Sequence, residues 1–330
     1  MSPAEPKVVA FGGGHGLYAT LSAIRRFTSQ VTAVVTVADD GGSSGRLRAE
    51  LDQIPPGDLR MALAALAGEA PDDRLWTRLA QHRFGGSGAL AGHSVGNLVL
   101  AGLTEVLGDP VAALGAFGQV LGVTGTVLPM TTTPLTITAE VTGLEADPAA
   151  RRTIRGQVAV ATTPGQVECV ALDPPAPPAT PAVLDAIAGA DLIVLGPGSW
   201  FTSVIPHLLV PDLVAALRAS PARTALVLNL VPEPGETAGF SAARHLQVLA
   251  EHAPGFRVDT VVIDTDAVPP SGERTDLAAA AALLGARPEY ARVAEPGAPR
   301  HDPAALAATL AELSGTDASA DRLPSGTQVG

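Results

Sequence analysis

The sequence has few cysteines, lysines and aromatic residues. Because Cys169 is the single cysteine, a disulfide within the chain and a cysteine-based zinc site are both excluded, which fits a reducing compartment. Lys7 is the single lysine among 21 basic residues, and 33 acidic residues bring the net charge to −12. This balance argues against a general binder of nucleic acids or anionic membranes, because both need an excess of cations. Aromatic residues make up 3%, so alanine, valine and leucine must fill the core.

The sequence also shows no pattern typical of a targeting or membrane-spanning segment. The first residues, M-S-P-A-E-P-K, lack the basic stretch and apolar core of a signal peptide, and no apolar run approaches the length of a membrane span. We therefore expect a cytoplasmic protein that binds neither membranes nor nucleic acids. A local group of arginines could still recognise a small phosphate ligand.

What the chain does have is an alternation of short apolar strands and helical segments. This alternation predicts an α/β fold of Rossmann-like, doubly wound type, with a mostly parallel sheet. The expected strands are Lys7–Phe11, Thr32–Val37, Leu192–Leu195, Thr224–Leu230 and Val258–Asp264. The expected helices run to about Phe27, from about Arg46, and over Leu59–Ala67, Arg74–His82, Ser94–Leu107, Val183–Ala188, Val204–Leu217, Ala242–Glu251, Leu277–Leu284 and Pro303–Leu313.

We predict one Rossmann-like domain over residues 7–314, between a short tail (1–6) and a disordered polar tail (315–330). Threonine-rich alternation over about residues 127–172 predicts a small antiparallel β insertion, with strands at Gln157–Thr162 and Val167–Leu172. Five prolines among residues 173–181 make the following stretch a stiff connector.

Glycine-rich and polar loops follow four of the expected strands, at residues 12–16, 38–48, 196–199 and 231–239. In a doubly wound sheet, ligands bind in the crevice at the carboxyl ends of the strands. Because all four loops fall at that edge, they predict a ligand site more specifically than any one of them does alone.

The first loop contains Gly12, Gly13, Gly14, His15 and Gly16, a variant of the dinucleotide fingerprint. Its glycines could serve only helix–sheet packing, but phosphate at the N-terminus of the helix that follows is the stronger interpretation. His15 could donate to that phosphate or simply face solvent.

The second loop, A-D-D-G-G-S-S-G-R-L-R, is the densest polar segment of the chain. Asp39 stands where a ribose-binding acid would, and Asp39 and Asp40 could instead hold a cation. Ser43 and Ser44 could cradle phosphate oxygens. The segment also satisfies G-x-S-x-G, the nucleophile elbow of α/β-hydrolases, for which His245, His252 or His301 would have to supply the base. Two carboxylates directly before Ser43 would oppose an oxyanion, which disfavours a hydrolase.

Five further residues are candidates with ordinary structural alternatives. Asp58 is as well explained as a helix cap as by a ligand. Asn97 stands one helical turn after His93 in an apolar run, and a buried amide needs a partner. Gly198 and Ser199 form a second anion-binding turn, whereas an isolated arginine before a helix, such as Arg300, is usually solvated.

Several of these motifs together resemble one family. They are V-V-A-F-G-G-G-H-G-L, T-A-V-V-T-V-A-D-D-G-G-S-S-G-R-L-R, P-P-G-D-L-R, G-H-S-V-G-N-L, G-P-G-S-W-F-T-S-V-I-P-H-L-L-V and the Pro234–Phe240 segment. In order from Lys7 to about Leu313, the chain resembles the YvcK-type gluconeogenesis factors, which share a superfamily with the CofD 2-phospho-L-lactate transferases.

The resemblance implies a cytoplasmic protein that binds UDP-sugars, notably UDP-N-acetylglucosamine, supports gluconeogenic growth and influences cell shape and wall synthesis. It implies no established catalytic activity and leaves the regulatory protein partner and the oligomeric state open. Carried over by position, it places the nucleotide near the glycine loop, near Arg300, and near further motif residues: Asp39, Asp40, Ser43, Ser44, Asn97, Gly198 and Ser199.

The chain departs from the family pattern at His15, Met61 and the Trp200-Phe201 pair, and Asp276–Ala286 contains no tyrosine for ligand contact. Two other functions stay open. One is a phosphoryl-type transferase in which Asp39, Asp40 or Asp58 holds Mg²⁺, and Asp40 is the candidate metal ligand among them. The other, a nicotinamide dehydrogenase, lacks a clear histidine for hydride transfer.

Overall fold

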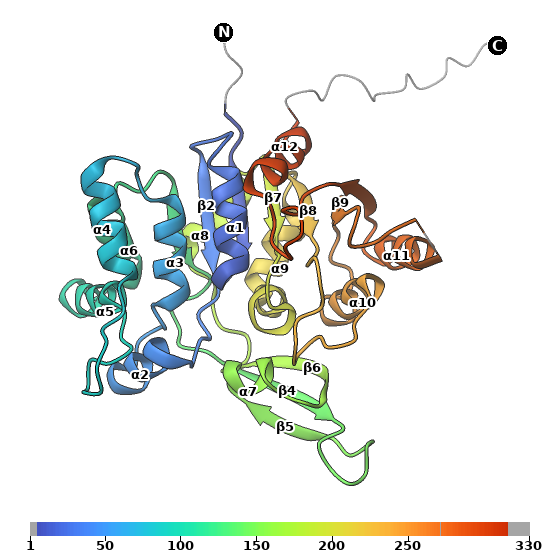
Figure 1. Cartoon of the computed structure of the whole chain (residues 1–330), viewed down its shortest axis with the longest axis horizontal. Coiled ribbons are helices and arrows are strands. Elements are labelled where there is room, and N and C mark those ends of the chain that lie inside the picture. The colour runs from blue at the N-terminus through green and yellow to red at the C-terminus, as the bar shows by residue number, and fades with distance from the viewer. Residues whose placement is uncertain (1–4, 271, 316–330) are drawn as a thin grey trace.

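A seven-stranded parallel sheet forms the centre of the computed structural model, which describes residues 5–270 and 272–315 (Figure 1). The strand order is β10-β9-β8-β7-β1-β2-β3, and all adjacent pairs are parallel. The strands are β1 (Val8–Gly12), β2 (Val31–Val35), β3 (Thr126–Pro129), β7 (Leu192–Leu195), β8 (Arg223–Val227), β9 (Thr260–Asp264) and β10 (Arg287–Ala291). β1, β7 and β9 are buried along their whole length, as strands covered on both faces must be. The predicted α/β, Rossmann-like class is confirmed.

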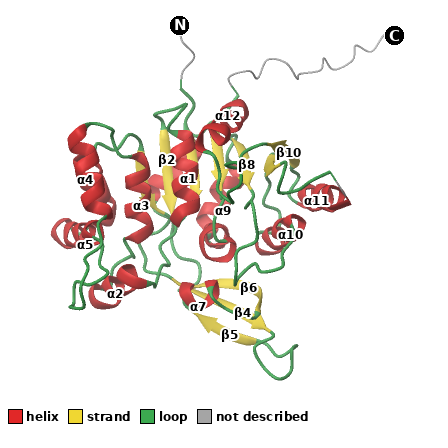
Figure 2. Cartoon of the chain, in the orientation of Figure 1, coloured by secondary structure: helices red, strands yellow, loops and turns green. Residues whose placement is uncertain are grey.

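Helices cover both faces of the sheet (Figures 1 and 2). α1, α3 and α12 pack side by side on one face, and α8 packs with α9 on the other. The helices are α1 (Gly14–Ile24), α2 (Gly42–Leu51), α3 (Gly57–Leu66), α4 (Pro71–Gln81), α5 (Val95–Leu107), α6 (Pro110–Val120), α8 (Pro181–Ala188), η1 (Trp200–Val204), η2 (Ile205–Leu209), α9 (Pro211–Ala219), α10 (Ala242–His252), α11 (Gly272–Leu283) and α12 (Pro303–Leu313).

The order of the strands reverses at β1. From β1 the chain adds β2 and β3 on one side, and it later adds β7 to β10 on the other. Because parallel crossovers are right-handed, the helices of the two halves lie on opposite faces. The loops after β1 and β7 therefore diverge and leave a crevice between them, which is where such sheets bind ligands.

A second, three-stranded antiparallel sheet lies across the carboxyl edge of the large one (Figure 1). It consists of β4 (Thr136–Thr142), β5 (Arg152–Arg155) and β6 (Gln166–Asp173), with the short helix α7 (Gln157–Ala161). Two sequence predictions differ from this arrangement. Residues 127–129 belong to β3 of the large sheet, and the strand expected at Gln157–Thr162 is a helix. Gly156, at φ 97°, turns the chain out of β5, and one helical turn is enough to bury Val160.

Other differences have local causes. α2 begins at Gly42, four residues before the expected start, because the glycine–serine run is itself helical. The helix expected over Val204–Leu217 is divided into η1, η2 and α9. Strand β10 was not expected because its sequence, R-P-E-Y-A, is polar and only half-buried at the edge of the sheet. Residues 316–330 of the predicted disordered tail lie outside the described residues.

Within residues 5–270 and 272–315, no single helix has both the length and the apolar composition needed to cross a membrane. The pair Trp200–Leu209 and Pro211–Ala219 meets those two criteria only when its parts are joined, and it is bent by 76°.

Candidate functional site

A pocket of about 540 Å³ opens at the point where the strand order reverses. It lies between the first turns of α1 and the loops that follow β7 and β8, and the segment before α12 closes its far side. Its polar lining comes from His15, Gly16, Gly198, Asn229, Glu233, Glu295, Arg300 and His301, and its apolar lining includes Tyr18, Ala19, Leu230 and Val231. The volume is within the usual range for a small-molecule site.

The glycine loop brings the N-terminus of α1 to this pocket. Gly13 occupies the N-cap position and has no side chain to cap the helix. Gly16 packs against the loop after β7 so closely that a Cβ there would lie 2.1 Å from the carbonyl oxygen of Pro197. Thr20 holds the same two segments together, because its hydroxyl donates to the Gly196 carbonyl at 3.0 Å. The helix N-terminus therefore faces the pocket at a fixed position and favours an anion there.

Asn229, at the end of β8, fixes the turn after β7. Its Oδ1 accepts from the Gly198 N–H and its Nδ2 donates to the Gly198 carbonyl, both at 2.9 Å. Gly198 has φ 142°, in the region that favours glycine. Sequence reasoning missed Asn229 because it regarded the residue as part of a strand. The signal was an amide side chain at the carboxyl end of an otherwise apolar strand.

Arg300 reaches the pocket from a hairpin held by Asp264. The Asp264 carboxylate accepts from the Val293 and Ala294 N–H groups at 2.9 and 3.0 Å, and the Glu295 N–H donates to the Arg300 carbonyl at 2.8 Å. Burial acts to raise the pKa of Asp264, but four backbone N–H groups bring it below its ordinary value. The Arg300 guanidinium donates to Glu295 through Nε at 3.0 Å.

His301, next to Arg300, is the more buried of the two pocket histidines. Burial lowers the pKa of His301 to about 4, so its ring is neutral at pH 7. His15 is exposed at the pocket mouth. A ligand phosphate would therefore meet one exposed histidine and a guanidinium that is already paired with the Glu295 carboxylate through Nε and Nη2.

A second group of polar side chains lies on the other side of the glycine loop; we call Ser43, Arg60, His93 and Asn97 the polar cluster. Arg60 Nε donates to Asn97 Oδ1 at 2.8 Å, Asn97 Nδ2 donates to Ser43 Oγ at 3.1 Å, and Ser43 Oγ lies 2.9 Å from His93 Nδ1. Because a guanidinium can only donate, the donors are fixed from Arg60 through Asn97 to Ser43, whereas the direction of the bond between Ser43 and His93 depends on the histidine tautomer. All four side chains are buried.

The three acidic candidates do not act together. Asp40 faces the small sheet, where its Oδ1 accepts from the Val158 N–H at 2.9 Å. Asp39 instead interacts with Asp58 across the start of α3. Burial and the Asp39 charge raise the pKa of Asp58 to about 7, against the Gly14 N–H and the charge of Arg60, which both act to lower it. Asp40 is therefore a link between the two sheets, whereas Asp39 and Asp58 form a pair.

The positions of these carboxylates decide which of them could bind the cation that the sequence analysis considered. No cluster of three or more His, Cys, Asp or Glu side chains in the described part of the chain is placed to hold a metal ion. Asp39 and Asp58 are the two carboxylates that could flank one, since a cation would relieve their mutual repulsion. The Asp39–Asp40 pair cannot, because the two side chains bond to different segments, Gly41 and Val158.

Ser199 does not line the pocket. It is the N-cap of η1, and its carbonyl accepts from the Ser203 and Val204 N–H groups. Trp200 and Phe201 are fully buried, so the pair that departs from the family pattern packs inside the protein. The Phe201 N–H donates to Glu236 at 3.3 Å, and burial raises the pKa of Glu236 to about 8.

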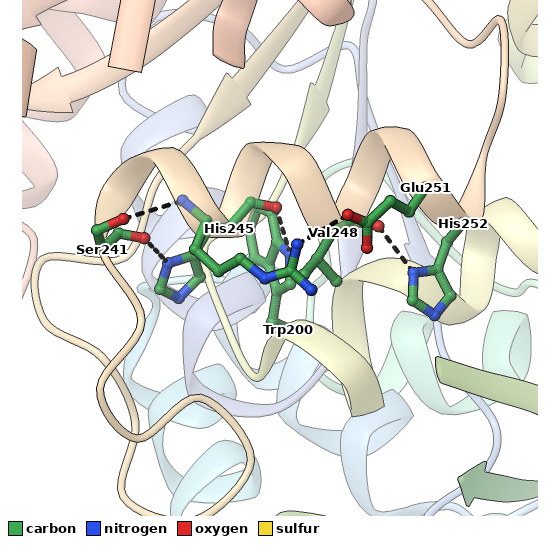
Figure 3. A network of polar contacts seen from close by, with 7 residues as sticks. Trp200, Ser241, His245, Val248, Glu251 and His252 are labelled. Carbon is green, nitrogen blue, oxygen red and sulfur yellow. Dashed lines mark hydrogen bonds and ion pairs between the residues drawn. The ribbon is translucent and has the colours of Figure 1, made fainter. Parts of the chain in front are cut away.

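The late histidines required by the hydrolase alternative are engaged elsewhere. Trp200 Nε1 donates to the His245 carbonyl at 2.9 Å, and His245 and His252 each bond through Nδ1 to a backbone carbonyl in or next to α10 (Figure 3). Ser43 bonds His93 instead, a residue from the middle of the chain.

Comparison with known proteins shows the family to which this chain belongs. The sequence profile described as 2-phospho-L-lactate transferase CofD matches residues 8–286. The chain belongs to the CofD family. A family member from Mycobacterium tuberculosis is 66% identical over 317 residues, which are 96% of this chain and 93% of that protein. A Bacillus subtilis protein named gluconeogenesis factor is 38% identical over 265 residues, 80% of each chain.

The CofD-family fold is also known from crystals. A crystal structure of a Bacillus halodurans protein superimposes with a TM-score of 0.82 and 35% sequence identity, covering 93% of this chain and 99% of that one. The named relatives place this chain among the gluconeogenesis factors of the CofD family, the YvcK-type branch.

Proposed function

We propose that this gluconeogenesis factor is a cytoplasmic regulatory protein that binds a UDP-sugar, UDP-N-acetylglucosamine, and thereby influences cell shape and wall synthesis during gluconeogenic growth. The observation that carries the proposal is the pocket of about 540 Å³, in which the N-terminus of α1 and the Arg300 guanidinium face the same space. A helix N-terminus and an arginine together favour a pyrophosphate.

The rest of the pocket suits the two ends of such a ligand. Tyr18, Ala19, Leu230 and Val231 give apolar surface for a base or a sugar ring. Glu233 and Glu295 offer carboxylates that accept hydrogen bonds from sugar or ribose hydroxyls. The acidic side chains also disfavour a ligand of high negative charge that lacks hydroxyl groups.

Isothermal titration calorimetry with UDP-N-acetylglucosamine tests the proposal, with UDP, uridine and GDP as comparison ligands. Arg300→Ala removes a charged hydrogen-bond donor, so we expect the dissociation constant to rise about tenfold or more. Arg292→Ala is the matched control, because Arg292 is exposed on the same hairpin and does not line the pocket. Saturable binding that Arg300→Ala leaves unchanged would overturn the assignment of this pocket.

A phosphoryl-type transferase is the second candidate, favoured by the Asp39–Asp58 pair. In that case the two carboxylates would hold Mg²⁺, which would supply charge neutralisation at a transferring phosphoryl group. Magnesium-dependent turnover that Asp58→Asn abolishes, with Asp40→Asn active, would favour the transferase. UDP-sugar binding that EDTA leaves unchanged would favour the regulatory protein.

A further inference from the structure

Arg60 is a buried cation with an unused donor. Its side chain is 3% exposed, its Nε donates to Asn97, and its Nη1 is buried and has no hydrogen-bond partner. Among the residues that the structure describes, Arg60 forms no ion pair. Leaving a charged donor unpaired in the interior is costly, so such a group calls for a ligand or a structural explanation.

The Arg60 side chain runs along the N-terminus of α5. A Cβ on Gly96, in the first turn of α5, would lie 2.8 Å from Arg60 Cδ, so the arginine stem runs directly along that turn. Ser94 is the N-cap of α5 and is fully buried, yet its hydroxyl caps no N–H and has no partner. A helix of 13 residues thus begins beside a guanidinium with one unpartnered nitrogen, Arg60 Nη1, and beside the unpartnered Ser94 hydroxyl.

The surrounding charge is positive. Burial and the neighbouring Arg83 lower the pKa of Arg60 to about 10, which still leaves it charged at pH 7. Arg46 acts on the adjacent His93, although Glu50 opposes it there. Asp58 is the carboxylate that acts on Arg60, but the two do not form an ion pair in the described part of the chain. The guanidinium therefore has no directly bonded counter-charge.

We propose that Arg60, Ser94 and the N-terminus of α5 form a second anion site, which binds a small oxyanion such as inorganic phosphate. The anion accepts from Arg60 Nη1, from the Ser94 hydroxyl and from the Gly96 N–H, because the neighbouring Val95 and Asn97 N–H groups already donate to the His82 and Ser94 carbonyls. A water molecule would fill the hydrogen bonds but not the missing negative charge, so an oxyanion is the better partner.

This site is separate from the UDP-sugar pocket, and the proposal does not depend on that ligand. None of the residues that carry it lines the pocket of about 540 Å³. The two are connected through Asp58, which acts on Arg60 and accepts from the Gly14 N–H at the start of α1.

The glycine-rich segment 85–92 precedes Ser94 in the chain and is held by several hydrogen bonds. Gly92 N–H donates to the Phe84 carbonyl at 2.8 Å, and Phe84 N–H donates to the His93 carbonyl at 3.0 Å. Arg46 and Arg83 hold the segment through the Ala91 and Gly92 carbonyls at 2.7 and 3.0 Å.

Titration of the full chain with inorganic phosphate tests the proposal, with thermal stability as the readout and sodium chloride at matched ionic strength as the reference. A ligand of the folded state raises stability in a saturable way. Arg60→Met keeps the apolar stem and removes the charge, so we expect phosphate affinity to fall about tenfold or more. Arg292→Ala should bind phosphate as the wild type does, because Arg292 is exposed and belongs to neither site.

The outcomes are distinct. The proposal is overturned if phosphate has no saturable effect on the wild type. It is also overturned if Arg300→Ala removes a saturable effect that Arg60→Met retains, because the anion then occupies the UDP-sugar pocket. If Arg60→Met does not fold, Ser94→Ala decides: weakened phosphate affinity supports the site, and unchanged affinity rejects it. UDP-sugar binding that fails while phosphate binding persists contradicts the proposed function alone.

Discussion

Replacing Asn229 by alanine should loosen the turn that forms one wall of the pocket. The amide makes two hydrogen bonds of 2.9 Å to the Gly198 peptide, one as acceptor and one as donor. Each bond contributes about 0.5–1.5 kcal/mol net, and partial exposure of both residues lets water replace some of that. We therefore expect Asn229→Ala to lower the free energy of unfolding by about 1–2 kcal/mol.

The variant should remain folded, because a domain is typically stable by about 5–15 kcal/mol. Urea unfolding measures the stability change, and calorimetry with UDP-N-acetylglucosamine on the folded variant measures binding. We expect weaker binding, since the Gly198 turn is no longer held against the N-terminus of α1.

Asn229→Asp is the informative companion. It keeps the acceptor for the Gly198 N–H but places a negative charge beside the Gly198 carbonyl and at the edge of the pocket. If the pocket holds a pyrophosphate, this variant should bind more weakly than Asn229→Ala. Unchanged unfolding free energy and unchanged affinity in both variants would refute the role assigned to Asn229.

Three further predictions follow from single contacts. Burial raises the pKa of Glu236 from 4.5 to about 8, so between these pH values the folded protein keeps a proton that the unfolded chain releases. The free energy of unfolding therefore falls as pH rises through this range. Urea midpoints measured across it should fall less in Glu236→Gln than in the wild type. Asp40→Ala removes the bond to the Val158 N–H, so hydrogen exchange of α7 should become faster while that of β1 stays unchanged. Gly16→Ala places a Cβ 2.1 Å from the Pro197 oxygen, and we expect a larger loss in ligand affinity than in the unfolding midpoint.

The central strands could be predicted because burial on both faces leaves a simple mark in the sequence. Leu192–Leu195 is predicted and observed with the same bounds, and β1, β2, β8 and β9 differ by a few residues at their ends. Glycine and polar residues directly after these apolar runs also located the edge at which the pocket lies.

The polar and short elements could not be predicted in the same way. β10 is an edge strand with charged residues, and α7 is a single turn whose V-A-V alternation is typical of a strand. Their conformations depend on neighbours from distant parts of the chain. For α7 the neighbour is Asp40, more than a hundred positions earlier.

The sequence grouped the candidate site residues into one site, and the structure divides them. His15 and Gly16 of the glycine loop line the pocket together with Gly198 and Arg300, whereas Gly12, Gly13 and Gly14 do not. Ser43, Asn97, Asp39 and Asp58 do not line it either. Proximity in sequence gave Asp39 and Asp40 a shared role, but Asp39 accepts from the Gly41 N–H and Asp40 from the Val158 N–H, on different segments.

The pocket combines the loop after β1 with the hairpin that precedes α12. Gly16 and Arg300 therefore line the same pocket although they lie near opposite ends of the sequence. During synthesis, a nascent chain that has already formed β1, β2 and α1 still lacks the wall that carries Arg300. The complete pocket is consequently a property of the finished tertiary structure. A chain whose Asp264-held hairpin has not yet docked would lack the wall that carries Arg300.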